Sequence, residues 1–217
     1  MLVLPFSGCD KEQEADKVYL NGTGGTGGGG GGTGGGGGGT NSGPVDPATI
    51  DINSEPIWAC DGNGTDYVCY DSTSWHSQLL SIMTSNAAIS QFALGDVPYA
   101  AQVQLYGFTW SGADPTQAEM DAFFAPGARP FTDLSLSPGV LISMTPSMSG
   151  NPIYQSNLGA QPSSSSFTIT DVQPYPFGSF AGVKVRAVWQ CTLKSTSGSD
   201  VQCVDGIFVG YFTGDAN

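Results

Sequence analysis

Hydrophobic and polar residues alternate strictly over residues 183–194. The positions expected to face a core are Val183, Val185, Ala187, Trp189, Cys191 and Leu193. The positions between them, expected to face water, include Lys184, Arg186, Gln190 and Lys194. A period of two residues is typical of a strand with one buried face. We expect this strand to pair with residues 201–212 as a hairpin.

Short apolar runs separated by Pro, Gly, Asn and Ser predict further strands along the rest of the chain. They cover residues 49–52, 56–60, 67–70, 99–109, 134–136, 140–145 and 165–172. Many short strands with frequent turn residues are typical of antiparallel sandwiches and barrels. The predicted fold class is therefore mainly β, an antiparallel β-sandwich or an open barrel.

Two short helices are expected to interrupt these strands. The first begins with Asp114 as N-cap, Pro115 at the first helical position and Gln117 completing a capping box, and it ends at Pro126 and Gly127. Its apolar face would consist of Met120, Phe123 and Phe124. The second helix, over residues 74–85, would place one apolar stripe on the sheet, made of Trp75, Leu79, Ile82 and Met83.

Glycine is concentrated in one stretch. Residues 22–43 contain half of the 32 glycines, together with only Thr, Asn and Ser. A segment without apolar side chains cannot offset the entropy lost on ordering its backbone, so we expect a disordered tether. The stretch lacks the Gly-Lys-Ser/Thr ending of a P-loop and is not predicted to bind nucleotides. From Pro44 onward the composition is ordinary, which predicts one β-rich domain over residues 45–217.

The charge balance excludes several functions. The chain has 217 residues, with 19 Asp and Glu against 6 Lys and Arg, and a formal charge of −13. Binding to nucleic acid or to anionic lipid requires a cationic surface, so neither is expected. A single histidine also makes most zinc sites difficult to build.

A short apolar run ending in small residues precedes Cys9, and acidic and polar residues follow it. Phe6-Ser7-Gly8-Cys9 resembles the lipobox of bacterial lipoproteins, in which the signal peptide is cut before a lipidated cysteine. The resemblance implies that residues 1–8 are part of a signal peptide, that Cys9 carries the lipid, and that residues 9–44 form the anchor and linker. It predicts a lipoprotein of the cell envelope, periplasmic or surface-exposed, which meets the membrane only through this anchor.

Four cysteines remain in the domain, in two close pairs. Pairing Cys60 with Cys69 would centre a hairpin turn on Gly64-Thr65, a dipeptide suited to a type II′ turn. Pairing Cys191 with Cys203 would leave the loop Thr196-Ser197-Gly198, with Gly at a left-handed position. We therefore predict disulfides Cys60–Cys69 and Cys191–Cys203, which implies an oxidising compartment.

The segment between the first two of these cysteines is rich in oxygen ligands. Asp61, Asn63, Thr65 and Asp66, with Asp71 beyond, alternate in a Gly-containing loop of the kind that collects calcium. The loop lacks the Gly and Glu that an EF-hand would place at positions 66 and 72. The same Asp, Asn and Gly also suit an ordinary hairpin turn. Calcium is thus an alternative here, and no other cofactor is expected.

The sequence contains few combinations of residues that could form a catalytic site. His76 is the single imidazole, and no nucleophile elbow accompanies it. The two glutamates after the tether, Glu55 and Glu119, show no spacing that selects a glycosidase pair. Aromatic side chains at Trp58, Trp110 and Tyr175 are candidates for stacking on sugars, although packing in a β-sandwich core explains them more simply.

The order of segments between residues 139 and 212 is similar to the C-terminal halves of uncharacterised bacterial envelope lipoproteins, which implies no particular activity. We therefore predict a lipid-anchored envelope lipoprotein with a non-enzymatic binding or structural role, whose partner is an envelope protein or a glycan. The alternatives are a carbohydrate- or calcium-binding module and, ranked lower, a secreted hydrolase.

Overall fold

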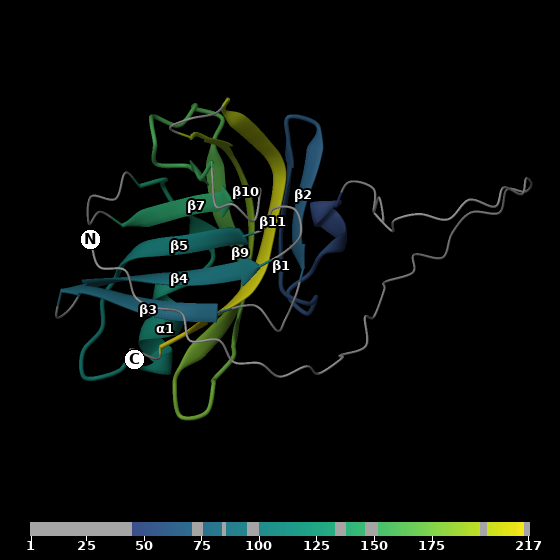
Figure 1. The fold of residues 1–217 in the computed structure, drawn as a ribbon. Coiled ribbons are helices and arrows are strands. Elements are labelled where there is room, and N and C mark those ends of the chain that lie inside the picture. Colours follow the sequence, from purple (N-terminus) through teal and green to yellow (C-terminus); the bar gives the residue numbers. More distant parts are fainter. Residues whose placement is uncertain are drawn as a thin grey trace, which may run out of the picture. The chain divides into compact units, whose positions relative to one another are not determined.

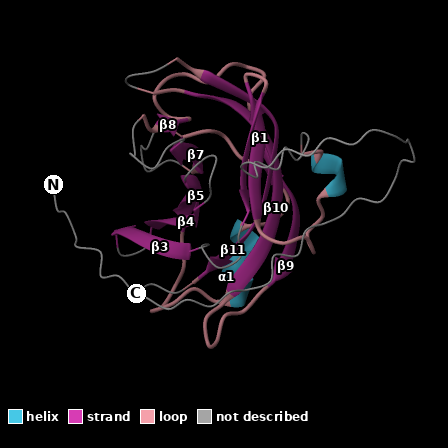
Figure 2. Cartoon of the chain, turned by 45° about the vertical axis from the view of Figure 1, so that its right-hand side comes forward, coloured by secondary structure: helices cyan, strands magenta, loops and turns pink. Residues whose placement is uncertain are grey.

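The fold is that of a computed structural model, which describes residues 45–70, 76–83, 86–94, 100–132, 138–145, 152–195 and 199–214, with the backbone alone for those between 69 and 94. Two antiparallel sheets face each other and form a sandwich (Figures 1 and 2). The mainly β fold class predicted from the sequence is confirmed. The predicted anchor and linker, residues 9–44, lie outside the described residues.

The larger sheet, sheet A, has the strand order β2-β1-β11-β10-β9-β6. Its strands are β1 (Ile57–Gly62), β2 (Thr65–Tyr70), β6 (Gly127–Ala128), β9 (Ser166–Pro174), β10 (Gly182–Leu193) and β11 (Val201–Thr213). β10 and β11 pair from Gly182 with Thr213 to Leu193 with Val201, which confirms the C-terminal hairpin. The first strand of the domain, β1, pairs with the last, β11, so sheet A joins both ends of the folded chain.

The second sheet, sheet B, has the order β3-β4-β5-β7-β8. Its strands are β3 (His76–Met83), β4 (Asn86–Leu94), β5 (Ala100–Phe108), β7 (Gly139–Thr145) and β8 (Tyr154–Gln155). In Figure 1 they run across the direction of the sheet A strands, as in an orthogonal packing. Gln155 of β8 exchanges two backbone hydrogen bonds with Lys194, at the end of β10, of 2.8 and 3.0 Å. This bridge joins the two sheets at one corner, and the sandwich is not closed into a barrel among the described strands.

The core lies between the sheets and follows the alternation seen in the sequence. All six predicted inward positions of β10 are at most 3% exposed. The facing positions of sheet B, Val103, Leu105, Ile142 and Met144, are equally buried. Side chains from both sheets thus form one continuous hydrophobic cluster, the main source of stability in such a fold.

One short helix, α1 (Gln117–Phe123), packs at the lower end of the sandwich (Figure 2). Its first turn is capped by Thr116 and Glu119, and not by Asp114 and Gln117 as predicted. Glu119 also accepts hydrogen bonds from Ser111, and these backbone and hydroxyl donors lower its pKa to about 2. The Gln117 amide is used elsewhere, because it bonds the backbone of Gly182 at the start of β10.

Two other predictions of secondary structure are wrong. Residues 74–85, expected as a second helix, contain β3, which pairs with β4 along its length. Apolar residues at positions 79, 82 and 83 fit a helical stripe, but the pairing with β4 decides the structure of so short a segment. Residues 49–52, expected as a strand, contain the last residue of the 3-10 turn η1 (Pro47–Thr49), which Asp46 caps, and irregular chain after it. The expected strand over 134–136 lies outside the described residues.

The segment before β1 covers the outer face of sheet A. Val45 and Ile50 pack on a second hydrophobic cluster, formed by Ile57, Ala59, Ile207 and Val209. An irregular segment has backbone carbonyls that no strand pairs, and these need donors from elsewhere. Lys184 and Arg186 of β10 supply them, so the prediction that these side chains face water is wrong.

The two cations bind carbonyl oxygens along the incoming segment. The Lys184 ammonium donates to Ser54 O at 2.8 Å, and its residue is only 6% exposed. The Arg186 guanidinium donates to Ile50 O at 2.7 Å and to Pro47 O at 2.9 Å. It also contacts Thr170 and lies 3.5 Å from Asp171. We call residues 45–56, held by Lys184 and Arg186, the docked segment.

The variant Arg186→Gln is expected to loosen the docked segment. Because hydrogen bonds to charged groups contribute more than neutral ones, the free energy of unfolding should fall by about 2 kcal/mol. Hydrogen exchange followed by mass spectrometry should show faster exchange of peptides that cover residues 45–56.

Arg129→Gln is the matched control, because Arg129 also donates to backbone carbonyls, those of Phe123, Ala125 and Ala128, but far from the docked segment in sequence. Its exchange between residues 45 and 56 should equal that of the wild type. Equal exchange in all three proteins would show that Arg186 does not hold the segment.

Candidate functional site

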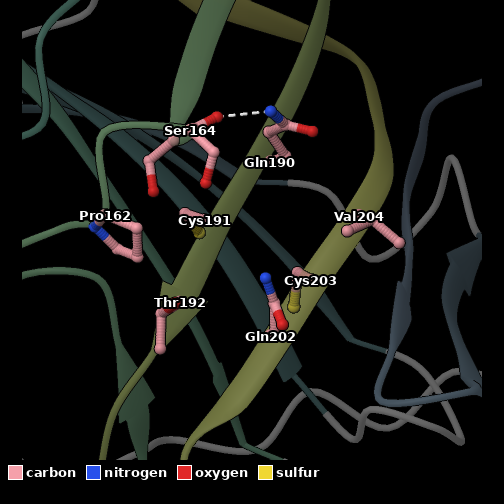
Figure 3. Close-up of a pocket in the computed structure, with 9 residues that line it drawn as sticks. Pro162, Ser164, Gln190, Cys191, Thr192, Gln202, Cys203 and Val204 are labelled. Atoms are coloured by element: carbon pink, nitrogen blue, oxygen red, sulfur yellow. Dashed lines mark hydrogen bonds between the residues drawn. The ribbon is translucent and has the colours of Figure 1, made fainter.

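Three cysteines lie on the inner face of sheet A, on three neighbouring strands. Cys60 comes from β1, Cys203 from β11 and Cys191 from β10, and each is at most 4% exposed. Figure 3 shows Cys191 and Cys203 on their adjacent strands. All three thiols are free in the structure. We call these residues the thiol cluster.

Burial controls the acidity of two members of the thiol cluster, Cys60 and Cys191. Desolvation raises the pKa of Cys60 far above its ordinary value, and a hydrogen bond with Cys203 adds to the effect. Burial also raises the pKa of Cys191, with a smaller contribution from Cys203. The thiolate is the nucleophile and the metal ligand, so burial disfavours reaction of Cys60 and Cys191 in the folded protein.

The predicted disulfides are not present among these thiols. Cys191 is opposite Cys203, as predicted, but the two are not bonded. Cys60 is opposite Tyr67, because the hairpin turns at Asn63-Gly64 and not at Gly64-Thr65. Both turn residues have positive φ, 56° and 79°, which is the type I′ geometry that Asn-Gly favours. The resulting register places Cys69 opposite Trp58, so the expected alignment of Cys60 with Cys69 is wrong.

A tryptophan pair packs beside the thiol cluster. The rings of Trp58 and Trp189 are 5.1 Å apart and tilted by 39°. Trp58 is 1% exposed, which removes it from any sugar-stacking surface. Gly206 lies opposite Trp189 in register, and a Cβ atom there would be 2.3 Å from Cδ2 of the indole. The close approach of ring and strand therefore requires glycine at this position.

The predicted calcium ligands that the structure describes serve as turn residues of the hairpin between β1 and β2. Asp61 Oδ1 accepts a hydrogen bond from Gly64 N at 2.7 Å. The Asn63 side chain bonds the backbone at Asp200 and Gln202. Asp66 is the register partner of Asp61, and Asp71 lies outside the described residues. Among the described side chains, no three of His, Cys, Asp or Glu lie close enough to hold a metal ion. Calcium binding stays a prediction.

The other predicted residues are placed as follows. His76 begins β3, where only the backbone is described. Trp110 is half-buried and stacks on Phe108 at 5.5 Å. Cys9 lies outside the described residues. Within the described parts of the chain, no helix has both the length and the apolar character to span a bilayer.

Exposed aromatic rings gather at the loop between β9 and β10. Phe177 is 65% exposed and Tyr175 is 43% exposed. The Tyr175 ring lies 4.3 Å from that of Tyr211, with an angle of 31° between the two ring planes. The Lys184 ammonium sits 5.3 Å from the centre of the Tyr211 ring. We call Tyr175, Phe177 and Tyr211 the aromatic patch; the loop that carries its first two members projects at the bottom of Figure 1.

The loop holds these rings in a defined position. Phe177 and Phe180 exchange two backbone hydrogen bonds of 3.1 and 3.0 Å around Gly178 and Ser179. Gly178 has a φ of 59°, which suits the first position of a two-residue hairpin turn. Sequence reasoning identified Tyr175 but missed Phe177 and Tyr211. The Pro-Tyr-Pro-Phe-Gly run at residues 174–178 was the available signal.

Among the depressions of the described surface are the following two. One, of about 140 Å³, lies beside β10 and β11 and is lined by Pro162, Ser164, Ser165, Gln190, Cys191, Thr192, Gln202, Cys203 and Val204 (Figure 3). Gln190 closes one side by a hydrogen bond to Ser164 O. This space is smaller than ordinary ligand pockets.

The second depression, of about 360 Å³, is lined by Leu105, Tyr106, Gly107, Ala122, Phe123, Ala128, Arg129, Pro130, Pro138 and Gly139. Its single charged side chain is Arg129, whose guanidinium donates to Phe123 O and Ala125 O. Burial lowers the pKa of Arg129 and raises that of Tyr106. Neither depression unites a nucleophile with a general base among its described residues, which is the pairing that covalent hydrolysis requires.

No protein-family model, curated protein or solved structure matches this chain.

The variant Gly206→Ala is expected to destabilise the protein by about 3 kcal/mol, because the new methyl group would displace the Trp189 ring in a packed core. Chemical denaturation followed by tryptophan fluorescence measures the change. Gly159→Ala is the control, since a Cβ there would meet the flexible end of Lys194 at 3.0 Å. If Gly206→Ala lowers the free energy of unfolding no more than Gly159→Ala does, the close packing of Trp189 on Gly206 does not require glycine.

Proposed function

We propose that the protein is a lipid-anchored lipoprotein of the bacterial cell envelope with a non-enzymatic binding or structural role. The observation that carries the proposal is the sequence Phe6-Ser7-Gly8-Cys9, followed by the Gly-rich stretch. The described fold supports it, because the docked segment fastens the start of the domain to sheet A. Force on a tether attached there would pass to β10 through Lys184 and Arg186, because the start of the domain is bound to the sheet.

The Gly-rich stretch suits the distance that such a domain must keep from a bilayer. A Gly-rich coil of the length between Cys9 and Val45 spans roughly 30–36 Å on average and can extend further. The acidic domain would be repelled by anionic lipid. A covalent anchor and a long tether would together hold the domain near the membrane without requiring its surface to adsorb.

The anchor is tested by Cys9→Ala in the full-length chain, expressed in the bacterium that makes it. The wild type should incorporate a labelled fatty acid and sediment with membranes, whereas the variant should do neither. Cys191→Ala is the control, because it removes a different thiol and should remain labelled. A Cys9→Ala protein that still carries the label, or that still sediments with membranes, would exclude Cys9 as the anchor.

The aromatic patch favours a carbohydrate-binding role for the domain. Flat ring faces suit the C–H surfaces of sugar rings, and the exposure of Tyr175 and Phe177 leaves them open. The packing of the Tyr175 ring against Tyr211 orients it before any ligand arrives, which reduces the entropy lost on binding. In the envelope, a glycan of the cell wall is the ligand class that fits this surface.

The glycan proposal is tested by sedimentation of the protein with purified peptidoglycan. The double variant Tyr175→Ala/Phe177→Ala should lose at least tenfold in apparent affinity, because stacking on an aromatic ring contributes about 1 kcal/mol or more. Leu158→Ala is the control, since Leu158 is also exposed, at 41%, but has no ring. Equal sedimentation of the wild type and the double variant would exclude the aromatic patch as the glycan site.

A further inference from the structure

A single asparagine fastens the turn between β1 and β2 to the start of β11. The Asn63 Nδ2 group donates to Asp200 O at 3.1 Å, and Gln202 N donates to Asn63 Oδ1 at 3.1 Å. Asn63 N also donates to Gln202 O at 3.2 Å. Both ends of the side-chain amide are thus held by the backbone of a segment more than 100 residues away in sequence.

The residue after Asn63 makes this asparagine chemically labile. Glycine has no side chain to hinder its backbone nitrogen, and this nitrogen can attack Cγ of a preceding asparagine. Asn63 and Gly64 are both exposed, so water and base can reach them. In the folded hairpin, however, Gly64 N donates its hydrogen to Asp61 Oδ1 at 2.7 Å. The nitrogen must lose this proton before it attacks, and the neighbouring carboxylate disfavours the negative charge that results.

We propose that Asn63 is a site of deamidation, which the folded hairpin keeps closed and which opening of the hairpin exposes. Gly64 N gives up its proton to a solvent base and bonds to Asn63 Cγ, and the side-chain nitrogen takes up a proton and leaves as ammonia. Water then adds to one carbonyl of the cyclic imide and breaks its bond to nitrogen. Attack at Cγ gives aspartate, and attack at the backbone carbonyl gives isoaspartate. An amide and a water become an acid and ammonia, without oxidation or reduction.

The contacts of the hairpin all oppose this reaction. Cγ can reach Gly64 N only if the Asn63 amide turns away from Asp200 and Gln202. The backbone is also held in a type I′ turn, with φ values of 56° at Asn63 and 79° at Gly64. Reaction therefore requires the hairpin to open, and its rate follows the fraction of molecules in which the hairpin is open.

The product cannot restore the lost contacts. A carboxylate at position 63 has no hydrogen to donate to Asp200 O, and it adds a charge to a hairpin that already carries Asp61 and Asp66. Isoaspartate also inserts an extra carbon into the backbone, which the two-residue turn does not accommodate. Each opening that leads to reaction leaves a permanent mark, so the site records past opening of the hairpin.

The test is incubation of the full chain at mildly alkaline pH in heavy-oxygen water, with and without denaturant, followed by peptide mapping for acids that carry the label. The sequence contains its own control, because Asn21-Gly22-Thr23 in the predicted linker repeats Asn63-Gly64-Thr65. In denaturant both asparagines should react at the same rate. In the folded protein, Asn63 should react at least about tenfold more slowly than Asn21. Equal rates in the folded protein, or no reaction of Asn63 in denaturant, would overturn the proposal.

The role of Asp61 is tested by Asp61→Ala. Loss of a hydrogen bond to a charged group should accelerate deamidation of Asn63 in the folded protein roughly tenfold. Asp66→Ala is the matched control, since Asp66 lies opposite Asp61 in the same hairpin and Gly64 N bonds to Asp61. Equal rates in the two variants would contradict the protective role of Asp61. Should Asp61→Ala fail to fold, the comparison of Asn63 with Asn21 in the wild type decides alone.

The variant Asn63→Asp reproduces one product of the reaction. It should lower the melting temperature by about 3 °C, because the hydrogen bond to Asp200 O is lost. Asn21→Asp is the control and should melt with the wild type. An unchanged melting temperature of Asn63→Asp would show that deamidation does not loosen the hairpin. These experiments depend neither on the lipid anchor nor on glycan binding, so they can fail independently of the proposed function.

Discussion

The pairing of β11 with both β1 and β10 is the constraint on which the rest of the structure depends. β11 lies inside sheet A and is bonded on both sides, so its course determines the positions of both neighbours. Its bulge near Asp205 shifts both registers at once. The thiol cluster, the Trp58–Trp189 pair and the glycine that accommodates Trp189 all lie at this level. A single irregularity thus organises the centre of the core.

The two faces of β10 have different roles, because one packs in the core and the other binds the docked segment. Its inward row fills the core, as the alternation in the sequence predicts. Its outward row contains Lys184 and Arg186, and alternation alone assigns such residues to solvent. Their actual partners are carbonyl oxygens of the docked segment, more than 100 residues away in sequence. Periodicity identifies which face a side chain occupies, but it does not reveal that another segment covers that face.

The same distinction explains which parts of the fold could be predicted. Strands with strong alternation, such as β10, β11 and β5, were predicted almost to their ends. β3 was misassigned and β4 was missed, because their apolar residues do not distinguish a helix from a strand and their pairing is tertiary. The cysteine register failed for a local reason, since the Asn63-Gly64 turn outweighed a Gly64-Thr65 turn that would have aligned Cys60 with Cys69. The bulge near Asp205, which brings three cysteines of neighbouring strands to the same level of sheet A, has no local signal in the sequence.

The small number of basic residues determines the charge of the domain surface. Arg129, Lys184 and Arg186 each donate to backbone carbonyls, and Arg186 also lies near Asp171. Hydrogen bonds to neutral carbonyls leave the charge of these cations unchanged. The negative surface has a simpler cause, because the chain has 19 Asp and Glu against 6 Lys and Arg. Such a surface is repelled by anionic bilayers and gains little from electrostatic attraction to them. A domain of this kind can remain at a membrane only through a covalent anchor or a bound partner, and the proposed lipid on Cys9 would supply the first.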